Sequence, residues 1–291
     1  MQFALSSYSL HPLTDSGELT EKELIALTKQ LGFAGIEFAE IHPPAGADKC
    51  AYAAELREEA RRVGIPVTQY SVGADFLYGS GGDLQAEIER LRGEVDVAVA
   101  LGAPSMRHDT AHGWRGGEAA YKGFDQALPR IIEGARAVTE YAATRGVKTL
   151  TENHGLFCQD SERVERIVTG VGHPNFGALV DMGNFLCADE DPVTAVGRMA
   201  KYAAYVHVKD FHFKSGSEDV PPDGFFKTRG GNWLRGAVLG HGIVPVRQCL
   251  QILRDAGYDG FVTLEFEGCE EPRRGCEWGL HTLQKLTEAL A

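Results

Sequence analysis

Four apolar stretches of the sequence end in side chains that bind metals or move protons. Thr149-Leu150-Thr151 runs into Glu152, Leu179-Val180 into Asp181, Tyr205-Val206 into His207, and Val262-Thr263-Leu264 into Glu265. A buried strand that delivers polar groups at its end is typical of an active site in an α/β protein. The question is whether the rest of the chain can bring the four side chains together.

Short apolar segments alternate regularly with amphipathic helices along the chain. Strands are expected at 3–9, 32–38, 65–72, 104–107, 147–151, 176–180, 203–208 and 260–266, and helices at 19–31, 48–63, 83–101, 124–144, 161–169, 192–202, 244–256 and 272–290. Thr20 and Asp83 are typical helix-start residues, and Gly64 and Gly102 are typical helix-stop residues. The pattern therefore predicts eight β-α units.

Regular β-α alternation requires parallel strands joined by crossover helices. Eight such units in 291 residues favour an α/β fold with a single (β/α)8 TIM barrel over residues 1–291. The first expected strand is not followed by a G-x-G-x-x-G motif, which argues against an open dinucleotide-binding sheet. Residues 211–242 are too long for an ordinary connection, so we expect an inserted loop after strand seven that acts as a lid or an oligomer contact.

The barrel expectation gives the four polar side chains a common position. Glu152, Asp181, His207 and Glu265 would follow strands five to eight, whose carboxyl ends meet at one rim. Three carboxylates at that rim would repel one another unless a cation neutralised them. We therefore predict a divalent metal site; the ligand set suits Mn²⁺ best, with Mg²⁺, Co²⁺, Fe²⁺ and Zn²⁺ as alternatives.

The composition excludes several classes of protein. Acidic residues outnumber basic ones by 41 to 29, so the formal charge of −12 argues against nucleic acid or a membrane surface as a partner. No segment has the length and apolar character of a signal peptide or membrane span, so a cytoplasmic location is expected. The six cysteines form no C-x-x-C pair and are expected to be reduced thiols.

The runs around the four predicted ligands resemble those of the xylose isomerase-like TIM barrel superfamily, the sugar phosphate isomerase/epimerase group. Gly35-Ile36-Glu37, Asp181-Met182-Gly183-Asn184, His207-Val208-Lys209-Asp210 and Gly257-Tyr258-Asp259-Gly260 are similar to segments typical of that group. The resemblance covers essentially the whole chain. It implies a small-molecule carbohydrate substrate and leaves a homo-oligomer open.

In epimerases of this group, the glutamates corresponding to Glu152 and Glu265 bind the metal and stand on opposite faces of the substrate. The resemblance therefore implies that one removes a proton next to a carbonyl and the other returns a proton on the opposite face. The metal would stabilise the developing cis-enediolate. The sequence predicts a divalent-metal-dependent isomerase or epimerase of a keto-sugar or related polyol, with Glu152 and Glu265 as catalytic residues.

Further residues are candidates for contacting substrate. They are Glu37, Arg107, His108, His154, Asn184, Lys209 and His241, with His11 and Trp114 as candidates for an apolar wall. The sequence departs from the ketohexose epimerases, because Asn184, Phe213 and Cys158 stand where those relatives usually carry His, Arg and Glu. The departures put allulose or tagatose epimerisation in doubt.

Other functions remain open at this stage. His207-Val208-Lys209-Asp210 resembles the dehydratases of the group, so a metal-dependent lyase or dehydratase of a keto-sugar, keto-glycoside or inosose is the main alternative. A non-catalytic sugar-binding protein is less favoured, and a DNA-repair nuclease least, because the chain is acidic. Three lysines and two arginines between His207 and Val244 leave an anionic substrate open.

Overall fold

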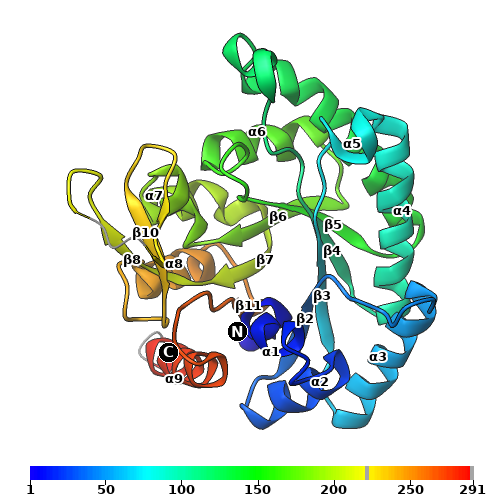
Figure 1. Ribbon diagram of the computed structural model, residues 1–291, viewed down its shortest axis with the longest axis vertical. Helices are drawn as coiled ribbons and strands as arrows, with labels where there is room; N and C mark the ends of the chain where they lie inside the picture. Colours follow the sequence, from blue (N-terminus) through cyan, green and yellow to red (C-terminus); the bar gives the residue numbers. More distant parts are fainter. Residues whose placement is uncertain (220–222, 289–291) are drawn as a thin grey trace.

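The chain forms a closed barrel of parallel strands surrounded by helices (Figure 1). The computed structural model describes residues 1–219 and 223–288. The barrel strands are β1 (Gln2–Ser6), β2 (Gly35–Ala39), β3 (Val67–Val72), β4 (Ser105–His108), β5 (Lys148–Glu152), β6 (Phe176–Asp181), β7 (Ala203–Val208) and β11 (Phe261–Leu264). Their order around the barrel is β1-β11-β7-β6-β5-β4-β3-β2, which confirms the predicted (β/α)8 TIM barrel.

The helices of the barrel lie where the sequence predicts them. They are α2 (Glu21–Gln30), α3 (Lys49–Val63), α4 (Leu84–Leu101), α5 (Phe124–Thr144), α6 (Ser161–Val171), α7 (Pro192–Met199), α8 (Val246–Asp255) and α9 (Pro272–Glu288), with a short α1 at His11–Asp15. Thr20 and Glu23 form a capping box at the start of α2, and Asp48 caps α3. Residues 289 and 290 of the last predicted helix lie outside the described residues.

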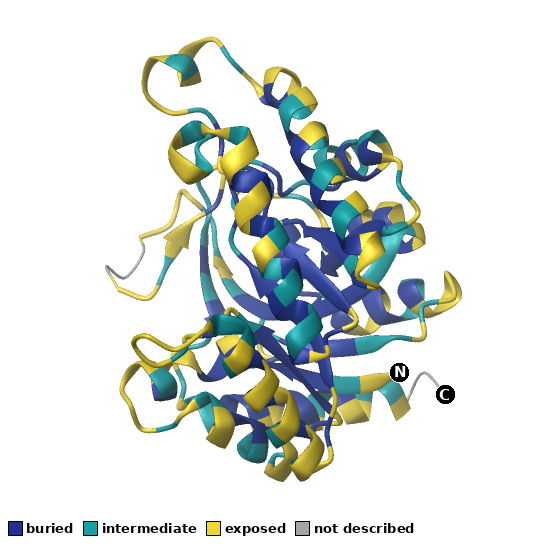
Figure 2. Ribbon diagram, turned by 90° about the vertical axis from the view of Figure 1, so that its right-hand side faces the viewer, coloured by how far each residue is buried: buried dark blue, intermediate teal, exposed yellow. Residues whose placement is uncertain are grey.

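The core lies on both faces of the barrel wall. All residues of β3 and β6 are buried, as expected for parallel strands packed between helices and the barrel interior. Figure 2 shows the buried strands at the centre and exposed residues along the outer sides of the helices. This arrangement holds the strand ends in fixed positions relative to one another.

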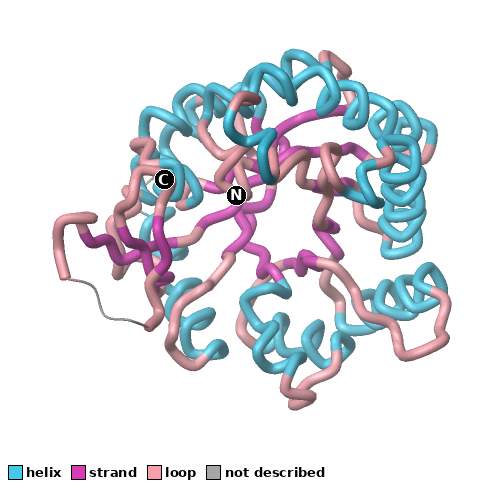
Figure 3. Tube along the Cα trace, turned by 45° about the horizontal axis from the view of Figure 1, so that its top comes forward, coloured by secondary structure: helices cyan, strands magenta, loops and turns pink. Residues whose placement is uncertain are grey.

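The segment predicted as an inserted loop forms a small antiparallel sheet. Its strands are β8 (Asp210–Lys214), β9 (Phe226–Lys227) and β10 (Trp233–Ala237), in the order β8-β10-β9. The sheet lies outside the ring of barrel strands (Figure 3). Residues 220–222 of the predicted 211–242 insertion lie outside the described residues. Its role as a lid or an oligomer contact stays a prediction.

Asp210 fastens the end of this insertion to the barrel. One carboxylate oxygen accepts backbone N–H groups from Gly240 and Gly242, and the other accepts that of Val244. A Cβ atom at Gly242 would lie 2.2 Å from that carboxylate, so glycine is required for the close approach. The insertion is therefore tied to the strand end that carries His207 and Lys209.

The cysteines and the apolar character of the helices also bear on the class of protein. All six cysteines are free thiols, as expected. Within residues 1–219 and 223–288, no helix combines the length and the apolar character that crossing a membrane requires.

Candidate metal centre

The four predicted ligands meet at the carboxyl-terminal end of the barrel. Glu152 and Asp181 end β5 and β6, His207 lies near the end of β7, and Glu265 directly follows β11. Asp181 and His207 are direct neighbours in the strand pairing, so their side chains point to the same side. Ligand atoms of all four residues lie within 4.8 Å of one another; Glu152, Asp181 and His207 are buried, and the side chain of Glu265 is 12% exposed.

Two buried polar atoms at the centre of the cluster have no hydrogen-bond partner among the described residues. They are Nδ1 of His207 and Oδ2 of Asp181. His207 Nδ1 lies 3.6 Å from Glu265 Oε1, 3.7 Å from Glu152 Oε1 and 3.8 Å from Asp181 Oδ2. These distances are too long for hydrogen bonds. One imidazole and three carboxylates gathered around a common centre, with two of their ligand atoms unpaired, fit a divalent cation.

Glu37 holds the His207 ring from behind. Its Oε2 lies 2.5 Å from His207 Nε2, while Ser71 Oγ donates to its Oε1 at 2.7 Å. When the ring is neutral, as a metal ligand must be, a hydrogen on Nε2 leaves the lone pair of Nδ1 directed at the carboxylates. Glu37, predicted to contact substrate, is fully buried behind the His207 ring. It does not line the cavity that opens above the four predicted ligands, here called the mouth cavity.

Asp181 is fixed by its own loop and by the neighbouring strand. Its Oδ1 accepts the backbone N–H groups of Gly183 and Asn184, both at 2.8 Å. The Asn153 side chain pairs with the Asp181 backbone through two hydrogen bonds. Asn184 Nδ2 also donates to Glu152 Oε1 at 3.1 Å. Asn184, predicted to contact substrate, therefore contacts the predicted metal ligand Glu152 and does not line the mouth cavity.

Each catalytic candidate has a buried cation beside it. Arg107 Nη2 lies 2.5 Å from Glu152 Oε2 and 3.0 Å from Asp109 Oδ1. Lys209 Nζ is paired with Glu265 Oε2 and lies 3.3 Å from Asp181 Oδ2. Lys209 comes close because Gly183 has no side chain; a Cβ there would lie 2.4 Å from Lys209 Cγ.

These cations keep both glutamates ionised. Burial alone would raise the pKa of Glu152, but Arg107 and His207 lower it to about 2. Burial also acts against ionised Glu265, but Lys209 and His207 hold its pKa well below the usual value. Both side chains are therefore carboxylates at neutral pH, the form that binds a cation or accepts a proton.

The third carboxylate has a different environment. Burial raises the pKa of Asp181 to about 7, although Lys209 acts in the opposite direction. Burial also opposes protonation of His207, but the carboxylates of Glu37 and Glu265 raise its pKa well above the usual value.

A cavity of about 470 Å³ opens above the cluster. Glu152, His207 and Glu265 line its floor, and the predicted substrate contacts Arg107 and His154 line its wall. His154 Nδ1 is bonded to Asp109 Oδ1 at 2.9 Å. Several lining residues were not predicted, among them Tyr8, Asp109 and Glu267. A signal was present, because Asp109 and Glu267 each lie two residues beyond an inward-facing residue, Arg107 or Glu265.

Two predicted substrate contacts lie elsewhere. The His108 ring packs between Phe76 and Phe176, because neighbouring strand residues point to opposite faces and Arg107 points inward. Burial lowers the pKa of His108 to about 4. His241 is exposed, with its ring 6.3 Å from that of Trp278. Neither histidine lines the mouth cavity.

Two further sets of residues were singled out in the sequence: the wall candidates His11 and Trp114, and the positions Cys158 and Phe213, which depart from the epimerase pattern. His11 lines the cavity, whereas Trp114 packs against Tyr78 and does not. Cys158 is buried and Phe213 is exposed on β8, and neither lines the cavity.

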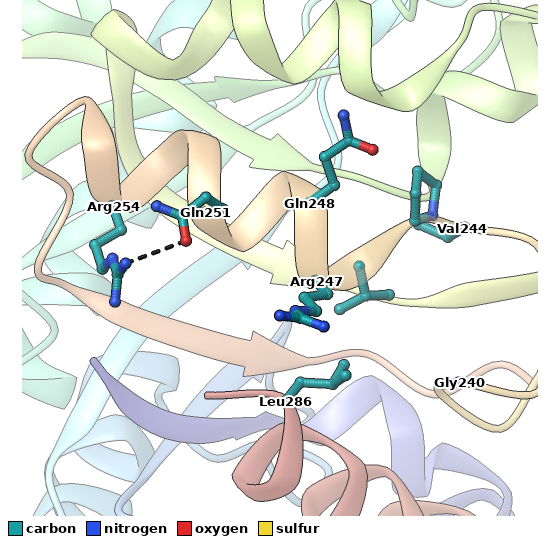
Figure 4. Close-up of a pocket in the computed structure, with 9 residues that line it drawn as sticks. Gly240, Val244, Arg247, Gln248, Gln251, Arg254 and Leu286 are labelled. Carbon is teal, nitrogen blue, oxygen red and sulfur yellow. Dashed lines mark hydrogen bonds between the residues drawn. The ribbon is translucent and has the colours of Figure 1, made fainter. Parts of the chain in front are cut away.

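A separate cavity of about 620 Å³ lies between α8 and α9 (Figure 4). Arg247, Gln248 and Gln251 of α8 line one side and Leu286 of α9 the other, and Arg254 donates to Gln251 at 3.1 Å. None of the four predicted ligands lines this cavity. It is therefore not part of the metal cluster.

A curated relative is similar to part of this chain. An inosose dehydratase of Lacticaseibacillus casei is 23% identical over 144 residues, 49% of this chain and 48% of the relative. The chain thus matches about half the length of that curated relative.

Solved structures match more of the chain. A xylose isomerase-like TIM barrel protein from Mycobacterium smegmatis in complex with magnesium has a TM-score of 0.70 and 20% identity, covering 93% of this chain and 89% of that one. D-psicose 3-epimerase with D-tagatose from Clostridium cellulolyticum H10 has a TM-score of 0.72 and 16% identity, covering 98% and 99%. At these identities the likeness shows the fold. A family model matches residues 25–286, and the chain belongs to the family that this model describes, the xylose isomerase-like TIM barrel proteins.

Proposed function

We propose that the protein is a divalent-metal-dependent isomerase or epimerase that moves a proton on a keto-sugar or related polyol through a cis-enediolate. The observation that carries the proposal is that Glu152 and Glu265 lie in the same cluster and face the same cavity. Both are ionised ligand candidates. The likeness to an epimerase fold supports the same reading.

The residues of the chain have distinct roles in this proposal. Glu152 and Glu265 remove and return the proton at the carbon next to the carbonyl. Glu37 keeps the His207 ring in the tautomer that directs Nδ1 into the site. A bound divalent ion, for which Mn²⁺ is our first choice, supplies a Lewis acid that stabilises the negative charge developing on substrate oxygen.

Lys209 favours a second candidate, a lyase or dehydratase that uses the same first deprotonation. Its ammonium group does not line the cavity, but it is paired with Glu265 and lies 2.9 Å from Glu267 Oε1, and both of these glutamates line the cavity. A proton held there can reach a departing hydroxyl or alkoxide through one of these carboxylates. The similarity to an inosose dehydratase points in the same direction.

Product analysis separates the two candidates. Mn²⁺-loaded protein is incubated in D₂O with keto-sugars, keto-glycosides and inososes, and the products are read by NMR and mass spectrometry. An isomerase or epimerase gives a product of the substrate's mass with deuterium next to the carbonyl. Loss of water or of an aglycone assigns the lyase instead. Tight sugar binding that survives chelation without exchange would favour a non-catalytic binding protein.

Three sequence predictions stay predictions: manganese as the metal in the cell, a cytoplasmic location, and self-association. Metal analysis of purified protein and its mass in solution test the first and the last.

A further inference from the structure

The charges around the mouth cavity narrow the substrate class. Described residues contribute seven carboxylates to the lining: Asp15, Glu21, Glu40, Asp109, Glu152, Glu265 and Glu267. Arg107 is the only lysine or arginine among the described residues that line this cavity. Its Nη2 is already paired with Glu152 and Asp109. A divalent ion, Arg107, Lys209 and a protonated His154 beside Asp109 together still leave the carboxylates in excess.

The basic residues that kept an anionic substrate open in the sequence are engaged elsewhere. Lys214 pairs with Glu218, Arg229 donates to Asp160, Lys227 lies over the Trp233 ring and Arg235 over the Phe225 ring. Lys209, the fifth, is enclosed by Asp181, Glu265 and Glu267. None of these five cations lines the mouth cavity.

An aromatic pair forms part of the cavity wall. The rings of Tyr8 and His11 are stacked, with centroids 4.7 Å apart and an interplanar angle of 20°, and both residues line the cavity. Tyr8 is 42% exposed, so its ring can receive the C–H face of a sugar ring. Carboxylates accept hydrogen bonds from hydroxyl groups, and the buried unpaired Nδ1 of His207 marks where the reacting end of the molecule is held.

We infer that the substrate is an uncharged polyhydroxylated molecule, bound through its hydroxyl groups to the carboxylates of the mouth and stacked on Tyr8 and His11, and not a sugar phosphate or a sugar acid. The inference rests on the proposed function and specifies its substrate class. A phosphate ester carries about −1.5 to −2 charges at neutral pH and would enter a mouth of like charge.

Binding measurements test the inference without requiring turnover. Dissociation constants of the full, Mn²⁺-loaded chain are measured by calorimetry for neutral ketohexoses and inososes and for their phosphate esters and carboxylic acids. We expect each neutral compound that binds to bind at least about 100-fold more tightly than its charged counterpart. The ratio should shrink as NaCl rises from low to high concentration, because salt screens the repulsion.

Charge variants attribute the effect to the mouth. The double variant D15N/E40Q should reduce the discrimination against the phosphate ester by about 10-fold. The matched control Glu58→Gln, on α3 and away from the cavity, removes a carboxylate without altering the ratio.

The outcomes separate this inference from the proposed function. Tighter binding of a phosphate ester or an acid than of its neutral counterpart overturns the inference, even where isotope exchange proves the proposed chemistry. Binding restricted to amino sugars also overturns it. Neutral compounds that bind with the expected preference but never exchange a proton support the inference and remove the proposed function.

Discussion

The two halves of the metal cluster stabilise equivalent glutamates by different means. Glu152 is held by Arg107 and Asn184, and its side chain is 3% exposed. Glu265 is held by Lys209, and its side chain is 12% exposed. A guanidinium is planar and presents its donors in a fixed fork, whereas an ammonium is a compact charge on a flexible stem. Burial acts against the charge of Lys209, but the carboxylates of Asp181, Glu265 and Glu267 raise its pKa well above the usual value. The Glu152 side therefore has a cation of fixed shape, and the Glu265 side has an ammonium that stays protonated beside three carboxylates.

This difference bears on the reaction. A symmetric proton relay needs only the two carboxylates. The lyase candidate also needs a proton for the leaving group, and the ammonium of Lys209 on the Glu265 side is a source of one.

The largest effects are expected from Glu152→Gln and Glu265→Gln. Each removes a proton acceptor and a ligand charge, so turnover should fall by at least about 10²- to 10⁴-fold in both. Thermal unfolding of the variants checks that the barrel is intact. A variant that is folded, binds metal and keeps its rate would exclude that glutamate from proton transfer.

Next in size is the contrast between Arg107→Met and Lys209→Met. The first leaves Glu152 buried without its arginine and Asp109 with only His154 beside it, and should cost about 3–5 kcal/mol of stability. The second leaves carboxylates that a divalent ion can neutralise. The rise in Tm on adding Mn²⁺ should therefore be larger in Lys209→Met than in the wild type.

Lys22→Met is a matched control for this pair. Lys22 pairs with Glu55 on the surface, where both side chains are about half exposed, so its loss should change stability by less than about 1 kcal/mol. Equal Mn²⁺ responses in Lys209→Met and Lys22→Met would contradict a role for Lys209 in balancing the charge of the metal cluster.

A smaller effect is expected from Glu37→Gln, which acts on the ligand between the two glutamates. Loss of the carboxylate behind His207 should weaken Mn²⁺ binding by about 10- to 100-fold. Metal affinity measured by calorimetry tests this, with Ser71→Ala expected to have a weaker effect in the same direction. Unchanged affinity in Glu37→Gln would show that Glu37 does not orient the ring.

The smallest effect is expected from Asn184→Ala. The substitution removes one hydrogen bond to Glu152. Among the described residues, no amide side chain makes an equivalent bond to Glu265. A net loss of about 0.5–1.5 kcal/mol corresponds to a several-fold lower kcat/KM. A loss as large as that of Glu152→Gln would instead place Asn184 among the groups that touch substrate.

The barrel and the meeting of the four polar side chains could be predicted because local sequence patterns determine them. Apolar runs separated by capped helices predict parallel strands, and a polar residue at the end of such a run must lie at the shared rim. Glu152, Asp181, His207 and Glu265 all follow this rule, and the structure brings them together.

The prediction was weaker where the direction of a side chain decides its role. Glu37 is on a strand and points inward, but Ser71 and His207 bury it below the mouth. His108 alternates with Arg107 and packs against Phe76 and Phe176. In the insertion, β8 pairs with β10, and a long stretch of chain separates the two strands. No local sequence pattern therefore distinguishes this segment from a loop.

The central claim is that one ion held by Glu152, Asp181, His207 and Glu265 supports proton removal next to a carbonyl. The most direct measurement is the rate of deuterium incorporation into a neutral keto-sugar or inosose substrate in D₂O, followed by NMR while Mn²⁺ is titrated into metal-free protein. The account predicts negligible exchange without metal and a rate that saturates at about one ion per chain. Exchange at full rate in the metal-free protein, or in Glu152→Gln and Glu265→Gln together, would contradict it.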